Sequence, residues 1–222
     1  MIITKQKPIS AIIETITGYK NIFITGCGSC ATLCKSGGEE EVAQMEADLK
    51  AKGFHITGST VIDEACHVLL TKRAYRQHSS NIKKSDAILV MACGAGVQAS
   101  RLATDIPVIP ALDTLFLGTT MRFGVFEQYC SMCGDCVLAT TDGICPVTRC
   151  PKGLLNGPCG GVDNDGMCEV DRSRKCAWVE IYEALKKRGQ VDRLKNIIPP
   201  KDYSKGSHPG SLDVKVRKDN AE

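Results

Sequence analysis

The sequence is poor in aromatic residues and in histidine. Of its 222 residues, 5% are aromatic, one is tryptophan and four are histidine, so we expect an aliphatic, alanine-rich core. The net charge of +3 is too small to suggest nucleic acid as a partner. Patterns of a serine–histidine–aspartate triad, a P-loop or a zinc-protease helix are missing, and no carboxylate pair stands out for acid–base catalysis. We therefore assign no catalytic residues.

Long apolar segments are missing too. No run of about 18 apolar residues occurs, so no membrane span is expected. The first residues, MIITKQKP, lack the apolar segment of a signal peptide, and we expect the protein to be cytoplasmic.

Cysteine, in contrast, is abundant, with 13 residues. Thiols stay reduced in the cytosol, and an odd number fits a set of disulfides poorly, so metal ligation is the preferred interpretation. The cysteines fall into two sets along the chain. The first half contains Cys27, Cys30, Cys34, Cys66 and Cys93, and the second contains Cys130, Cys133, Cys136, Cys145, Cys150, Cys159, Cys168 and Cys176.

The first half alternates between strand and helix patterns. Short apolar runs predict strands, and apolar residues at helical spacing between them predict helices. The strands are expected at 21–26, 54–62, 86–92 and 106–109, and the helices at 39–52 and 64–77. This order predicts an α/β fold with a small parallel sheet, Rossmann- or flavodoxin-like. We expect this domain at 1–120, a smaller cysteine-rich metal-binding domain with a terminal helix at 121–195, and a polar, basic tail at 196–222.

Cysteines of the first half follow directly after predicted strands. Cys27, Cys30 and Cys34 come after the first strand, and Cys93 comes after the central one. Carboxyl ends of parallel strands meet at one edge of a sheet, so these four thiols are predicted to converge on one metal centre. Their spacing suits a [4Fe–4S] cluster better than zinc. Cys66 is either a further ligand or a small thiol in the core.

The same turn admits a second interpretation. Residues Gly26–Ala31 match the dinucleotide-binding pattern G-x-G-x-x-G/A after a strand. However, signals for a helix start appear only near Glu39, and the three glutamates there would repel a pyrophosphate. The glycines are expected instead to let the backbone approach inorganic sulfide.

The second half is dense in ligands and poor in large apolar residues. Cys130, Cys133 and Cys136 have the Cys-x2-Cys-x2-Cys spacing of ferredoxin loops, with Cys145 or Cys150 as the fourth ligand. The remaining cysteines, up to Cys176, can form a second cluster, a zinc site or partly free thiols. We expect bound metal to supply much of the stability. A helix is predicted at 175–188, with Trp178 packing over the metal site.

Several motifs together resemble a known family. They are Gly26–Cys30, Met91–Gln98, the Asn-Gly-Pro-Cys-Gly-Gly block at 156–161, Cys168–Val170 and Cys176–Trp178. They are similar to the MetV-type iron–sulfur subunit of bacterial methylenetetrahydrofolate reductase, which shares the methylenetetrahydrofolate reductase C-terminal domain. The similarity extends over about residues 1–195.

The resemblance implies a non-catalytic redox subunit of an oxidoreductase complex. Two [4Fe–4S] clusters, with a third centre or zinc in addition, would pass electrons to the FMN of a TIM-barrel catalytic partner in one-carbon metabolism of the acetyl-CoA (Wood–Ljungdahl) pathway. A ferredoxin or an NADH-oxidising subunit would be the donor. A zinc-stabilised structural subunit of a reductase or corrinoid methyltransferase system is the alternative.

Overall fold

The computed structural model describes residues 1–206 and 208–214. The chain forms two compact units, Met1–Glu127 and Gln128–Glu222. Within the described ranges, no helix is both long and apolar enough to cross a membrane.

A four-stranded sheet organises the first unit. All neighbouring strands are parallel, in the order β3-β2-β4-β5. The strands are β2 (Asn21–Cys27), β3 (His55–Ile62), β4 (Ala87–Met91) and β5 (Val108–Pro110). The predicted α/β class and the parallel sheet are confirmed, with each strand within two residues of its expected position.

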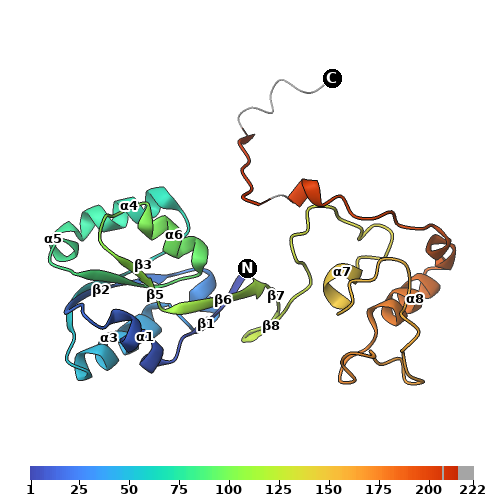
Figure 1. Cartoon of the computed structure of the whole chain (residues 1–222), viewed down its shortest axis with the longest axis horizontal. Helices are drawn as coiled ribbons and strands as arrows, with labels where there is room; N and C mark the ends of the chain where they lie inside the picture. Colours follow the sequence, from blue (N-terminus) through green and yellow to red (C-terminus); the bar gives the residue numbers. More distant parts are fainter. Residues whose placement is uncertain (207, 215–222) are drawn as a thin grey trace. The chain divides into compact units, whose positions relative to one another are not determined.

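Helices cover both faces of this sheet (Figure 1). The helices α4 (Val68–Gln77), α5 (Ser79–Ile82) and α6 (Gly94–Arg101) lie on one face, and α1 (Ile9–Ile16) and α3 (Glu39–Ala51) lie on the other. The predicted helix at 64–77 begins late, because residues 63–66 form a turn and His67 caps α4 with its ring nitrogen. The short α2 (Cys30–Leu33) completes the unit.

The core of the first unit lies between these layers. Every residue of β4 is buried, as expected of a central parallel strand, and Phe23 and Ile24 of β2 are fully buried. On α3 the buried positions are Val42, Met45 and Leu49, which confirms the predicted apolar face. The sheet is therefore a rigid base for the loops at its carboxyl edge.

Two antiparallel pairs in the first unit were not expected from the sequence. The strand β1 (Ile2–Gln6) pairs with β6 (Leu112–Leu117), and β7 (Thr119–Arg122) forms a hairpin with β8 (Val125–Glu127). β1 thereby joins residues more than a hundred positions apart, and short-range periodicity carries no information on such pairing.

The second unit contains little regular structure. Its elements are α7 (Pro146–Arg149), α8 (Ala177–Lys187) and the 3₁₀ helices η1 (Val191–Lys195) and η2 (Tyr203–Gly206). Trp178, Ile181 and Leu185 of α8 form a small buried cluster with Cys176. The helix expected at 175–188 is present but two residues shorter at its start and one at its end.

The segment that follows α8 packs against this unit over part of its length. Asn156 binds the main chain of Ile198 through both amide atoms, at 2.9 and 2.7 Å, and the side chain of Lys201 is buried. The polar tail expected from residue 196 onward therefore has ordered contacts in its first part. The rest of the tail prediction, residue 207 and residues 215–222, lies outside the described residues.

Candidate metal centres

Three cysteines of the first unit lie at the carboxyl edge of the sheet. The chain runs from β2 to β3 on one side of β2 and then to β4 on its other side, so the loops after these strands diverge at this edge. Such a point is where open α/β sheets bind ligands. Cys27 ends β2, Cys66 lies four residues after β3, and Cys93 lies two residues after β4.

Cys66 has a perturbed thiol. Its pKa is raised mainly by partial burial and next by the charges of Cys93 and Cys27. Cys66 is also exposed, so the alternative of a small core thiol is wrong.

Cys30 and Cys34 face a different part of the first unit. Both thiols contact Ile2 of β1: the Ile2 N–H donates to Cys30 Sγ at 3.5 Å, and Cys34 Sγ lies 3.8 Å from the Ile2 oxygen. The four thiols that were predicted to converge thus fall into two groups. Cys27 and Cys93 lie at the carboxyl edge, as Cys66 does, whereas Cys30 and Cys34 contact β1.

The glycines near Cys27 are needed for packing. A Cβ on Gly26 would lie 2.6 Å from the Gly37 oxygen, and one on Gly37 would lie 2.1 Å from the Met91 oxygen. These contacts seat the loop that carries Cys34 on the end of β4. Close approach of protein backbone therefore already explains Gly26, which we had expected to face sulfide. At the dinucleotide pattern, α2 has four residues only, so the long helix that such a site needs starts later, at α3.

In the second unit, Cys130, Cys133 and Cys136 lie on one tight loop. The Met132 N–H points at Cys130 Sγ at 3.3 Å, and Met132 and Gly134 have φ angles of +56° and +79°. Main-chain N–H groups directed at cysteine sulfur are typical of iron–sulfur loops, where they stabilise the added negative charge.

Four other cysteines of the second unit line a single small cavity. They are Cys150, Cys159, Cys168 and Cys176. Cys168 and Cys176 are buried, and their main-chain N–H groups donate to Arg174 and Gly166 at 2.9 Å each. Cys150 and Cys159 lie on loops rich in glycine. The cavity has a volume of about 20 Å³, so any group wider than one ion requires these two loops to separate.

A charged pair flanks this cavity. Glu169 Oε2 accepts from the Cys159 thiol at 3.0 Å and forms an ion pair with Lys152 at 2.5 Å. The bond from Lys152, followed by that from Cys159, holds the pKa of Glu169 below its usual value, and the bond to Glu169 raises the pKa of Lys152.

Cys145 lies outside the cavity. It precedes α7, and its Sγ is 3.6 Å from Thr148 Oγ1. The eight cysteines of the second unit thus divide into four around the cavity and four others, three on the tight loop and Cys145.

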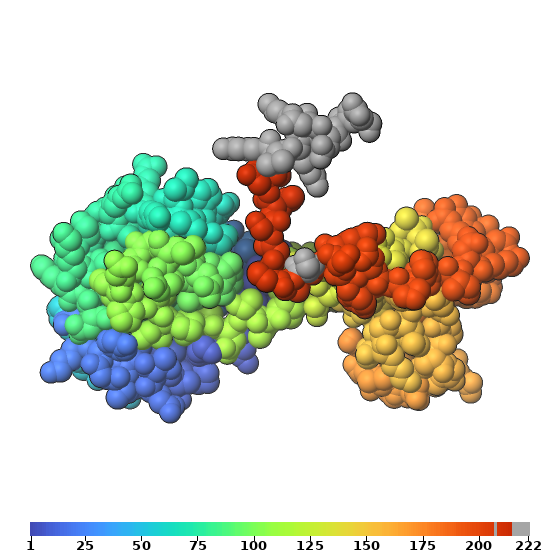
Figure 2. Space-filling view, turned by 45° about the horizontal axis from the view of Figure 1, so that its top comes forward, coloured from blue at the N-terminus to red at the C-terminus, as the bar shows by residue number. Residues whose placement is uncertain are grey.

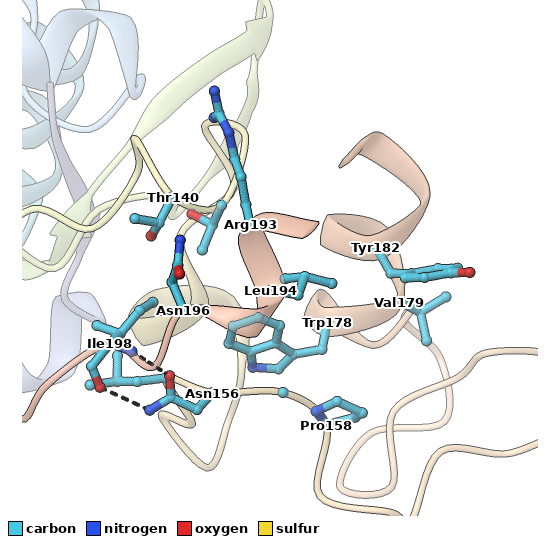
Figure 3. Close-up of a pocket in the computed structure, with 13 residues that line it drawn as sticks. Thr140, Asn156, Pro158, Trp178, Val179, Tyr182, Arg193, Leu194, Asn196 and Ile198 are labelled. Carbon is cyan, nitrogen blue, oxygen red and sulfur yellow. Dashed lines mark hydrogen bonds between the residues drawn. The ribbon is translucent and has the colours of Figure 1, made fainter. Parts of the chain in front are cut away.

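A larger, mainly apolar pocket of about 360 Å³ adjoins the four-cysteine cavity (Figure 3). Pro158 and Trp178 line both spaces. The Trp178 indole is almost fully buried, at 4% exposure, while Tyr182 at the rim is 44% exposed. Sequence reasoning placed Trp178 over the metal site but did not find this pocket, because its residues come from four separate segments.

The cysteines are chemically suited to bind metal, although in the described residues they are not arranged around a single ion. All 13 cysteines are free thiols. In the part of the chain that the structure describes, no three His, Cys, Asp or Glu side chains are close enough to hold one ion. Thiolate sulfur is the ligand of iron–sulfur clusters and a common ligand of zinc, so both groups match these residues chemically.

Comparison with known proteins gives a family match for part of the chain. Residues 109–204 match the family model described as the C terminal of methylene-tetrahydrofolate reductase. This segment contains all eight cysteines of the second unit. Neither the curated proteins nor the solved structures contain a match.

Proposed function

We propose that this chain is a non-catalytic electron-transfer subunit of a methylenetetrahydrofolate reductase complex and that its cysteines hold [4Fe–4S] clusters. A bound cluster accepts and releases one electron at a time. The proposed acceptor is the FMN of a catalytic partner subunit in cytoplasmic one-carbon metabolism, and a ferredoxin or an NADH-oxidising subunit is the proposed donor. The match of residues 109–204 to a reductase-associated family supports this setting.

The division of the second unit's cysteines into four and four carries the proposal. Two [4Fe–4S] clusters need four thiolates each. The first ligand set we propose is Cys130, Cys133, Cys136 and Cys145, and the second is Cys150, Cys159, Cys168 and Cys176. The sequence left the fourth ligand of the tight loop open between Cys145 and Cys150; the position of Cys150 in the cavity favours Cys145.

The carboxyl edge of the sheet is the proposed place of a third centre. Cys27, Cys66 and Cys93 lie at or just after the ends of the neighbouring strands β2, β3 and β4. Cys30 and Cys34 are the remaining thiols of this unit, and either can supply a fourth ligand if its contact with Ile2 is released.

Metal and sulfide analysis of protein purified without oxygen tests the proposal. We expect a brown protein with broad absorption near about 400 nm and iron matched by sulfide. Cys133→Ser and Cys168→Ser are each expected to remove about four iron atoms, and the double variant about eight. Ser131→Ala, in the same loop as Cys133, is the matched control and should keep all the iron.

Zinc is the alternative that the small volume of the four-cysteine cavity favours for that one centre. In that case Cys168→Ser loses one zinc ion and no iron, while Cys133→Ser still loses iron. A colourless protein with zinc at both sites would overturn the electron-transfer function and favour a structural subunit.

A further inference from the structure

We infer that Lys201 is a positioning residue for the Cys130–Cys136 loop and that its buried ammonium group raises the reduction potential of the iron–sulfur centre held there. This inference rests on the proposed function. It concerns residues far along the chain from the cysteines, in a segment that the sequence presented as a polar tail.

Lys201 is buried against the loop. Lys201 is 8% exposed, and its Nζ donates to the main-chain oxygen of Asp135. Asp135 lies between Cys133 and Cys136 in the sequence. An unpaired ammonium group costs free energy when it is removed from water, so a lysine is rarely buried without a compensating negative charge nearby.

The residues after Lys201 fasten the same loop. Asp135 accepts from the Asp202 N–H at 3.2 Å and from Lys205 Nζ at 2.8 Å. The two backbones also touch, since a Cβ on Gly134 would lie 2.6 Å from the Gly206 nitrogen. In Figure 2 this C-terminal segment, coloured red, lies against the yellow part of the second unit.

The charges at this contact are not equivalent. The Asp135 carboxylate is already paired with Lys205, and the Asp202 carboxylate turns to Ser204, whose N–H it accepts at 3.0 Å. Lys205 and the two aspartates are all more exposed than Lys201. Solvent screens exposed charges more strongly than buried ones, so the Lys201 ammonium is the least screened charge at this contact.

This ammonium group has a direct effect on electron uptake. A cluster held by four thiolates is anionic and becomes more so when it gains an electron. A nearby positive charge therefore stabilises the reduced form more than the oxidised form, which raises the reduction potential. The same bond to Asp135 fixes the backbone that presents Cys133 and Cys136.

A redox titration followed by EPR on the full, oxygen-protected chain tests the inference. The signal of this centre is first identified as the one that Cys133→Ser removes. Lys201→Gln, which keeps a donor but loses the charge, is expected to shift the potential of that signal to a more negative value. Lys201→Arg should restore it. Lys195→Gln, at an exposed lysine of the same unit that forms an ion pair with Asp192 at 2.5 Å, is the matched control and should leave it unchanged.

The results distinguish a failure of the proposed cluster from a failure of the proposed role of Lys201. If Cys133→Ser removes no iron, the proposed centre fails. If that centre is present but Lys201→Gln leaves its potential unchanged, or Lys195→Gln shifts it equally, the inference about Lys201 is wrong. Should Lys201→Gln fail to retain the cluster, Lys201→Met, which keeps most of the side chain without the charge, takes its place, and an unchanged potential in that variant overturns the inference.

Discussion

Trp178 and Leu154 are joined by a 3.0 Å hydrogen bond from the indole Nε1 to the main-chain oxygen. The bond holds the indole as the shared wall between the four-cysteine cavity and the 360 Å³ pocket. Because Trp178 is the single tryptophan of the chain, its fluorescence reports on this place alone.

Metal loading should therefore be visible in the emission of Trp178. An iron–sulfur cluster absorbs in the near ultraviolet, so a cluster in the four-cysteine cavity is expected to quench the fluorescence strongly. Zinc absorbs nothing there and should leave the emission intensity largely intact. The measurement is a comparison of metal-free, iron-reconstituted and zinc-loaded protein, with Cys168→Ser as the variant that should be quenched less because it keeps only the clusters held elsewhere. Equal quenching in Cys168→Ser would contradict the position of this centre.

Trp178 is also expected to contribute strongly to the stability of the second unit. Replacing this buried indole with alanine leaves a cavity and removes the bond to Leu154, at a cost of about 3–5 kcal/mol in the free energy of unfolding. Tyr182→Ala on the same helix changes a side chain that is 44% exposed and should cost about 1 kcal/mol or less. Hydrogen exchange at the amides of Ile181 and Leu185 gives both values. Similar losses for the two variants would show that the cluster around Trp178 does not hold the unit together.

In the first unit, Asp86 makes stability depend on pH. Its carboxylate accepts main-chain N–H bonds from Asn21 at 2.8 Å and Lys20 at 2.9 Å, and these bonds lower its pKa. A lowered pKa in the folded state means that this contribution is fully present above about pH 4 and is lost as the pH falls through the folded value. Below about pH 4 the native chain should therefore lose thermal stability more steeply than Asp86→Asn does, as measured by melting curves. Asp105→Asn, an exposed position of the same unit, should behave like the native chain.

A substitution at Gly37 tests how the loop that carries Cys34 packs on the end of β4. A Cβ atom at this position would lie 2.1 Å from the Met91 oxygen. Gly37→Ala should therefore lower the free energy of unfolding by about 1–3 kcal/mol and displace the loop. Gly94→Ala is the matched control. Its nearest neighbour would be Thr114 Oγ1 at 3.6 Å, at the start of α6, and the change should be neutral or stabilising by up to about 1 kcal/mol. Denaturant melts compare the two, and equal effects would refute the packing argument.

Local patterns were sufficient to predict the frame of the first unit. The apolar run at 86–92 predicted a buried central strand, and β4 is buried at every position. The spacing of Val42, Met45 and Leu49 predicted the buried face of α3. These features are set within a few turns or strand residues, so periodicity captures them.

Features that depend on distant pairing could not be predicted in this way. Cys66 looked like a candidate for the core, but the turn at 63–66 exposes it near Cys93, at the end of another strand. Likewise, nothing near Lys201 in the sequence indicates that its partner is Asp135. The division of the second unit's cysteines into two sets also follows from loop packing, which the spacing of Cys145 and Cys150 left open.

The bond between Lys201 and Asp135 joins groups 66 residues apart, and this separation has a consequence for biosynthesis. At a translation rate of about 5–20 residues per second, the tight loop leaves the ribosome roughly 3–13 s before the lysine that fastens it. During that interval the nascent loop lacks its contact with Lys201. If the loop holds the cluster that we propose, the cluster can be inserted before this contact forms.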